Sequence, residues 1–242
     1  MRKYIFLLFT LGIFLNSCKK KDSEILNPQA ELLNELGFNI KNVRFEKSNS
    51  NLVNTALKFE NKEVAKLYFK TLFDHNKTPF QGNVGLKWTL RKDFDPIEYI
   101  KNKLNQKNNF GESSSQSCLY PWMDGCDPNQ VVEDGPPGVA SFNQWIGWTG
   151  YNVNFTYNYS GGTFVVTEPN SGLIGMHLGV SWEQGATSFT NYPNSALIYF
   201  TIVGFQNYNI IVEGLGTVFT QTVTITGSYN TNTGAYTISS TP

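Results

Sequence analysis

Glu183 and Glu213 are the carboxylates with which the C-terminal half of this sequence could perform acid–base chemistry. Each lies at an end of an expected strand, where the paired acids of a glycosidase can converge on one sugar linkage. Acids at strand ends are also commonly exposed to solvent without any catalytic role. A polysaccharide-active hydrolase that uses Glu183 and Glu213 is therefore an alternative, and no complete motif assigns a catalytic residue.

The motifs of other enzyme classes are absent. The sequence contains no G-x-S-x-G, P-loop, H-E-x-x-H or G-x-G-x-x-G. Its only histidines, His75 and His177, are far apart and supply no obvious base for a nucleophile. We therefore expect no cofactor and no metal, and a binding or structural protein in preference to an enzyme.

Cys118 and Cys126 are the only cysteines after Cys18. A cysteine pair in an exported protein most often forms a disulfide, and this one would stabilise the fold by about 2.5 kcal/mol in the chain-entropy model. Two free thiols and a zinc site are alternatives, although C-x7-C lacks the close spacing of zinc ligands. The oxygen-rich segment 124–129 could bind calcium, but it lacks the spacing of an EF-hand and is better explained as a disulfide-bounded turn.

Aromatic side chains are a second chemical resource of the C-terminal half. Large aromatics set among Asn, Gln and Thr can stack on a sugar face, although most such residues in a β-sandwich belong to the core. The candidates are Trp122, Trp145, Trp148, Tyr151, Tyr157, Trp182 and Tyr192. We expect Trp145 and Trp148 to be exposed and to bind the ligand, because Gly147 and Gly150 make their segment loop-like.

Charge is distributed unevenly along the chain. Lys107 is the last basic residue, and acidic residues are sparse beyond it. Because phosphate contacts supply most of the affinity of proteins for nucleic acids, a region without Lys or Arg is a poor candidate for binding them. Asn, Thr, Ser and Gln can keep such a β surface in solution without charge.

The N-terminus has the pattern of a secretory signal. Arg2 and Lys3 precede an apolar run from Tyr4 to Phe14 that is too short to span a bilayer. Leu15, Asn16, Ser17 and Cys18 follow. This ending resembles the lipobox of bacterial lipoproteins, and the resemblance implies that Cys18 is acylated and becomes the first residue of the mature protein. Residues 1–17 would then be the signal peptide and 18–24 a charged tether.

The residues from 25 to 107 predict a small α+β region. Asn27 with Pro28, Asn61, and Asp95 with Pro96 are N-terminal signals of three helices. Alternating apolar residues predict strands within 38–45, 52–59 and 88–90. The strand-to-helix segment 56–72 loosely resembles the opening module of exported lipoproteins of unassigned function. Residues 108–126, rich in Gly and Ser at their start, would be a linker that holds the disulfide loop.

Residues 127–242 change to a two-residue period. Alternation from Tyr151 to Ser160, the turn at Gly161 and Gly162, and the return over 163–167 predict a hairpin. Further strands are expected over 173–182, 196–205, 208–213, 218–226 and 235–239. The segment 196–205 is apolar at both its odd-numbered and its even-numbered positions, so we expect it to be a central strand of its sheet. The fold class is mainly β, with a C-terminal antiparallel β-sandwich after the small α+β region.

These observations predict an envelope lipoprotein, lipid-anchored at the outer membrane, either periplasmic or surface-exposed. Its expected partners are the membrane, through the N-terminal lipid, and a glycan or a cell-surface protein, but no nucleic acid. The alternatives are the hydrolase described above and a subunit or adhesin in which an exposed sheet edge pairs with a partner strand.

Overall fold

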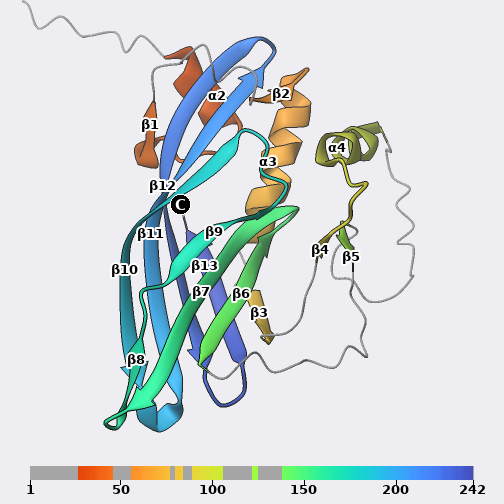
Figure 1. Cartoon of the computed structure of the whole chain (residues 1–242). Helices are drawn as coiled ribbons and strands as arrows, with labels where there is room; N and C mark the ends of the chain where they lie inside the picture. The colour runs from red at the N-terminus through yellow and green to blue at the C-terminus, as the bar shows by residue number, and fades with distance from the viewer. Residues whose placement is uncertain are drawn as a thin grey trace, which may run out of the picture.

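The computed structural model of the chain describes residues 27–45, 56–76, 80–83, 89–105, 122–124 and 138–241. Most of these residues form strands, arranged in two main sheets that face each other (Figure 1). The predicted mainly β class and sandwich arrangement are confirmed. The lipobox with Cys18, and the pair Cys118 and Cys126, lie outside the described residues.

The larger sheet is built on long strands that follow one another in the chain. In spatial order its strands are β10 (Val180–Tyr192), β11 (Leu197–Val212), β12 (Leu215–Asn230), β13 (Ala235–Thr241) and β3 (Phe80–Asn83). Two short strands extend it: β1 (Val43–Phe45) pairs with β12, and β2 (Leu57–Phe59) pairs in parallel with β11.

The second sheet is organised around β7. Its strands are β6 (Val139–Ile146), β7 (Thr149–Ser160), β8 (Thr163–Val166) and β9 (Asn170–Gly175). β6 pairs with β7 along one edge, and β9 and β8 pair with successive parts of the other edge. The β7–β8 hairpin confirms the one predicted at Gly161 and Gly162. A separate small pair joins β4 (Thr89–Leu90) to β5 (Met123–Asp124).

The boundary expected near residue 110 does not separate two structural units. β1, β2 and β3 come from the N-terminal region, and all three pair with strands of the C-terminal region. Strands from the predicted α+β region over 25–107 therefore belong to the same sheet as strands from 127–242. Charge composition changes near residue 107 because most of the described lysines lie in helices, whereas the strands after that residue carry uncharged polar residues on their exposed face.

Two apolar clusters cover the inner face of the larger sheet. One lies between the sheets, where Phe142 stacks on Tyr236 with ring centroids 4.6 Å apart. The other lies between the sheet and the helices, where Phe38 makes edge-to-face contacts with Phe69, Tyr208 and Phe219. The second sheet and the helices therefore cover different parts of the inner face of the larger sheet (Figure 1).

The helices begin where the sequence predicts them. They are α2 (Pro28–Glu35), α3 (Lys62–Asn76) and α4 (Pro96–Asn105), with short 3-10 turns η2 (Ile40–Asn42) and η4 (Pro193–Ser195). The Asn27 side chain accepts a hydrogen bond from Gln29 N at 3.1 Å, and Asp95 accepts one from Ile97 N at 2.8 Å. Such caps satisfy backbone N–H groups that a helix leaves without partners.

Several strands differ from the predicted ranges. The segments 196–205 and 208–213 form the single strand β11, which lies between β10 and β12 as its apolar pattern predicted. The expected strand 173–182 is instead divided between β9 and β10, because Gly175 and Gly179 adopt positive φ angles of 76° and 67° that reverse the chain.

Side-chain hydrogen bonds connect β10 of the larger sheet to the second sheet. Gln184 accepts a hydrogen bond from Ser171 N at 2.6 Å and donates one to Pro169 O at 2.7 Å. Asn191 donates to Phe164 O at 2.7 Å further along the same strand. The edge strand β10 is thus attached to the second sheet by side chains. The face of the larger sheet that points away from the second sheet stays open.

Candidate functional site

The outer face is the side of the larger sheet that points away from the second sheet and α3. Alternate residues of β11 are buried beneath it, so Tyr199, Thr201, Val203, Phe205 and Asn207 lie on the outer face. The paired residues of the neighbouring strands continue these positions sideways, because directly opposite residues in an antiparallel pair share a face.

Three exposed aromatic side chains lie on the outer face. The exposed fractions are 51% for Tyr192, 44% for Tyr199 and 41% for Phe205. The Tyr192 and Tyr199 rings meet at 82° with centroids 5.5 Å apart. Phe205 lies six residues beyond Tyr199 on the same strand, which is roughly 20 Å away. The outer face therefore carries an aromatic pair and a single aromatic ring along one line.

Hydroxyl groups of β12 and β13 lie beside the path between these rings, and the Asn207 amide lies just beyond Phe205. Thr226 and Ser239 are 3.0 Å apart through their hydroxyl oxygens, and Ser228 and Thr237 are 2.8 Å apart. Thr220 donates to Asn207 Oδ1 at 2.6 Å. Each hydroxyl has donor and acceptor capacity beyond its single neighbour, so this array can bind the hydroxyls of a ligand.

A hollow of about 480 Å³ lies beside Phe205. Threonines of β12 and β13 form its floor, namely Thr220, Thr222, Thr224 and Thr241. Lys41 and Arg44, from η2 and β1, form its wall. The hollow is polar with one aromatic edge, which suits a hydroxylated ring better than an apolar one.

Trp145 and Trp148 do not lie on any exposed surface. Their exposed fractions are 7% and 0%, and both belong to the apolar cluster beneath the helices. The expectation that these two residues are exposed is wrong. Gly147 does make a turn, with φ 63°, but that turn joins β6 to β7 and is packed against α3 and β9. A Cβ on Gly175 would lie 2.8 Å from the Trp145 ring and 2.3 Å from Trp148 O.

The buried position of Trp148 is fixed by a hydrogen bond. Its Nε1 donates to Tyr68 Oη at 3.0 Å, and its ring packs on Tyr68 and Trp122 at centroid distances of 4.9 and 5.7 Å. Burial raises the pKa of Tyr68 to about 12. These contacts show a structural role for the residue.

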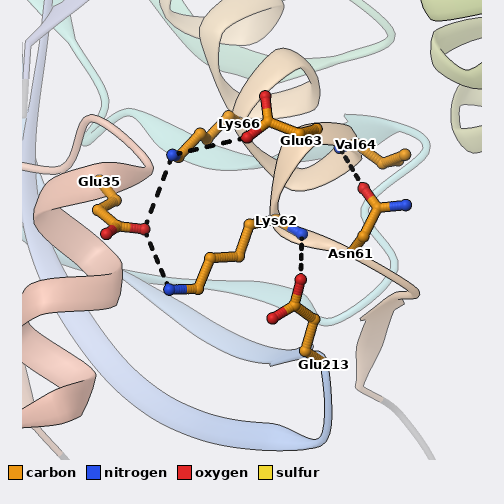
Figure 2. A network of polar contacts seen from close by, with 7 residues as sticks. All are labelled: Glu35, Asn61, Lys62, Glu63, Val64, Lys66 and Glu213. Atoms are coloured by element: carbon orange, nitrogen blue, oxygen red, sulfur yellow. Dashed lines mark hydrogen bonds and ion pairs between the residues drawn. The ribbon is translucent and has the colours of Figure 1, made fainter.

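Glu213 caps a helix. Its Oε1 accepts a hydrogen bond from Lys62 N at 3.1 Å, and Asn61 Oδ1 accepts one from Val64 N at 3.0 Å at the same helix end (Figure 2). Glu213 and Gly214 form the two-residue turn between β11 and β12, with φ angles of 50° and 82°. A carboxylate at the N-terminus of α3 is also favoured by the helix dipole.

Four charged side chains from α2 and α3, those of Glu35, Lys62, Glu63 and Lys66, form ion pairs near this capped end of α3. Lys62 Nζ lies 3.3 Å and Lys66 Nζ 3.7 Å from Glu35 Oε2, which ties α2 to α3 (Figure 2). Both pairs are substantially exposed, so each contributes little to stability.

Glu183 lies far from Glu213. It pairs in register with Phe205 on the outer face, eight residues before Glu213 along the β11 path, a distance of roughly 26 Å. Paired glycosidase carboxylates are separated by about 5 to 10 Å. The structure therefore does not bring Glu183 and Glu213 together, so these two residues cannot serve as the catalytic pair of the hydrolase alternative.

Most of the other aromatics nominated from the sequence are core residues. Trp122 and Tyr151 are buried, Tyr157 and Trp182 are partly buried, and Tyr192 alone of the nominated set is exposed. Sequence analysis missed Tyr199 and Phe205. The sequence feature that could have indicated them is that 196–205 is apolar at both its odd-numbered and its even-numbered positions. We interpreted this pattern as burial on both faces of the strand.

A small enclosed cavity lies where the two apolar clusters meet. It measures about 50 Å³ and is lined by Tyr151, Gln206, Gln221, Asn76 and Ser240 among others. Tyr151 donates to Gln206 Oε1 at 2.7 Å, and Ser240 donates to Asn76 Oδ1 at 2.7 Å. The cavity has room for a few water molecules but not for a sugar.

A larger, apolar groove of about 730 Å³ lies beside the β9–β10 connection, lined by residues such as Leu90, Met176 and Leu178. His177 also lines this groove, and its Nδ1 lies 3.1 Å from Gly175 O. Among the described residues, no three His, Cys, Asp or Glu side chains come close enough to hold a metal ion.

No helix within the described ranges is long and apolar enough to cross a bilayer. Comparison with protein-family models, curated proteins and solved structures finds no match. The outer face, defined by its own residues, is the candidate functional site.

Proposed function

We propose that this protein is a lipid-anchored envelope protein that binds a glycan chain non-enzymatically on the outer face of its larger sheet. The observation that carries the proposal is the placement of Tyr192, Tyr199 and Phe205, three exposed aromatic rings on one sheet face. Contiguous exposed aromatic side chains often mark a binding site, and the Tyr192–Tyr199 pair is contiguous.

The chemistry of the outer face matches a sugar. The apolar C–H face of a pyranose packs against an aromatic ring, and its hydroxyls exchange hydrogen bonds with neighbouring polar groups. The outer face offers both at once, because threonine and serine side chains of β12 and β13 lie beside the path between the rings. An extended chain that follows β11 would contact the tyrosine pair and Phe205 together.

The sparse charge of the C-terminal strands also favours this ligand class. Between Tyr199 and Phe205 the residues of β11 on the outer face are Thr201 and Val203, and the residues of β12 paired with them are threonines. A phosphate-rich ligand would require cations along this path. A neutral polyhydroxylated chain does not.

The envelope location rests on the resemblance of residues 15–18 to a lipobox. Acyl chains on Cys18 would hold the protein on a membrane by about 0.8 kcal/mol per buried methylene group. The outer face would then present its aromatic rings to glycans outside the membrane.

Affinity electrophoresis through gels that contain linear polysaccharides tests the proposal. The protein is the unlipidated chain from Lys19 onward, which keeps every described strand. We expect retardation by at least one polysaccharide and about a tenfold weaker affinity in Tyr199→Ala and in Phe205→Ala, equivalent to about 1.4 kcal/mol each.

The matched control is Tyr159→Ala. Tyr159 is 60% exposed but belongs to the β7–β8 hairpin, outside the outer face. Its removal should leave the affinity unchanged. Retardation that survives in both outer-face variants would contradict the proposed site, and release of reducing sugar would contradict the non-enzymatic role.

A further inference from the structure

We propose that the hollow beside Phe205 is a subsite for an anionic group, a carboxylate or a sulfate ester, carried by the same glycan chain. This inference rests on the proposed function and specifies its ligand class as an acidic polysaccharide. Lys41 and Arg44, the two cations of the hollow, carry it.

Both cations are exposed and keep their charge available. Within the described part of the chain, ion pairs engage Lys62, Lys66, Lys70, Arg91 and Lys101, but neither Lys41 nor Arg44. Lys41 N forms a backbone hydrogen bond to Asn39 Oδ1 at 3.2 Å, which fixes the turn but leaves the ammonium group unused. Lys58, Lys92 and Lys103 form no ion pair in the described part of the chain either, but Lys41 and Arg44 are the two basic residues that line the hollow together.

The register of β1 places Arg44 at the edge of the threonine array. Arg44 pairs with Thr220, and Thr220 lies opposite Asn207 on β11. A guanidinium group binds carboxylate and sulfate oxygens in a planar, two-pronged geometry. Threonine hydroxyls on the floor of the hollow can donate to the remaining oxygens.

Among the described residues of the larger sheet, Glu183 is the acid that lies on the outer face. It pairs with Phe205, and β11 and β12 separate its strand from β1. Three strand spacings amount to about 14 Å, which exceeds the screening length of about 8 Å at physiological ionic strength. Glu183 therefore does not neutralise Arg44, and the Phe205 ring stands between the two charges.

The hollow and the tyrosine pair have separate roles under this proposal. The tyrosine pair is about 20 Å away along β11 and has no cation beside it on the neighbouring strands. Neutral rings of the chain would stack there, and an acidic unit would be bound near Phe205. Amino-acid changes at the tyrosine pair should thus alter affinity for the glycan backbone, whereas changes at the hollow should alter the preference for acidic groups on the glycan.

The experiment uses the unlipidated chain and matched polysaccharide probes: underivatised, carboxymethylated and sulfated forms of cellulose, laminarin and dextran. Affinity is measured by affinity electrophoresis at low and at physiological salt. We expect at least one acidic form to bind about tenfold more tightly than its neutral counterpart, with a preference that weakens as salt rises. The two acidic arms identify whether carboxylate or sulfate is recognised.

Variants separate the subsite from the rest of the face. Arg44→Gln and Lys41→Gln should abolish the acidic preference while leaving affinity for the neutral form intact, whereas Tyr199→Ala should weaken both. Lys103→Gln, which removes an exposed charge on α4, is the control with the same change in net charge. It should have no effect.

Each failure has its own signature. Equal binding of neutral and acidic forms, or an acidic preference that Lys103→Gln reduces as much as Arg44→Gln does, would overturn the subsite and leave the glycan-binding function standing. Absence of binding to every probe would overturn both.

Discussion

The environment of Trp148 shows that this residue stabilises the fold, although the sequence predicted that it binds a ligand. It lies in the core and donates a buried hydrogen bond to Tyr68. Truncation of a large buried aromatic leaves a cavity and typically costs 3 to 5 kcal/mol. We expect Trp148→Ala to lower the free energy of unfolding by about this amount in urea titrations.

The exposed Tyr159 provides the comparison for that substitution. Tyr159→Ala should change the free energy of unfolding by less than about 0.5 kcal/mol, as is usual for surface positions. Equal losses in the two variants would contradict the assignment of Trp148 to the core.

Buried tyrosines predict a loss of stability at high pH. Burial raises the pKa of Tyr68 and of Tyr236 to about 12, from the ordinary value of 10.0. Between pH 10 and 12 the unfolded chain therefore releases protons that the folded chain retains, so folded stability is complete below pH 10 and declines above it.

The decline should reach about 1.4 kcal/mol per pH unit for each such tyrosine. Urea unfolding measured at successive pH values tests this, and Tyr236→Phe should make the decline shallower. Ionisation of these phenols near pH 10 in the folded protein, followed by tyrosinate absorbance, would contradict the burial.

At the level of single residues, sequence analysis could find the cap residues but not the exposed aromatics. Asn27, Asn61 and Asp95 were predictable because a cap depends on its nearest neighbours. Tyr199 and Phe205 were not, because strand periodicity gives the two faces of β11 but not which of them another layer covers.

Among the elements, the β11–β12 hairpin joins the sheet to α3. Glu213 occupies a left-handed turn position and accepts the hydrogen bond from Lys62 N. Loss of a helix cap costs about 1 kcal/mol. We expect Glu213→Ala to lower the free energy of unfolding by that amount, as measured by thermal or urea unfolding.

Glu183→Ala is the matched substitution for the hairpin. It removes an exposed acid for which the structure shows no hydrogen bond, and it should be nearly neutral. A larger loss in Glu183→Ala than in Glu213→Ala would contradict the capping role.

Element boundaries were predictable where turn chemistry is local. The β7–β8 hairpin was found because Gly161 and Gly162 supply the positive φ angles of its turn. The division of 173–182 into β9 and β10 was missed, because its glycines lie within an apolar run that reads as one strand.

For the molecule as a whole, the pairing of β1, β2 and β3 with the C-terminal strands predicts that the two halves fold together. A chain from 108 to 242 would lack all three strands and the helices that cover the inner face. We expect this fragment to aggregate or to unfold without cooperativity, whereas the chain from residue 25 onward unfolds in one transition. Circular dichroism and size-exclusion chromatography distinguish these outcomes.

A cooperative, monomeric 108–242 fragment would contradict this view of the sheet. The pairing of these strands across the compositional change could not be predicted from the sequence. Composition and charge report which residues meet water locally, but a short strand such as β3 is held by a partner more than 150 residues away, which local patterns do not encode.

The position of β13 has a consequence for when the protein can fold. β13 is not an edge strand: it lies between β12 and β3, and it brings β3 into the sheet. A nascent chain in which β13 is still inside the ribosome or a translocation channel cannot complete this hydrogen-bonded ladder. Folding of the larger sheet is therefore delayed until β13 has been released, and the polypeptide can stay extended during any passage across a membrane until then.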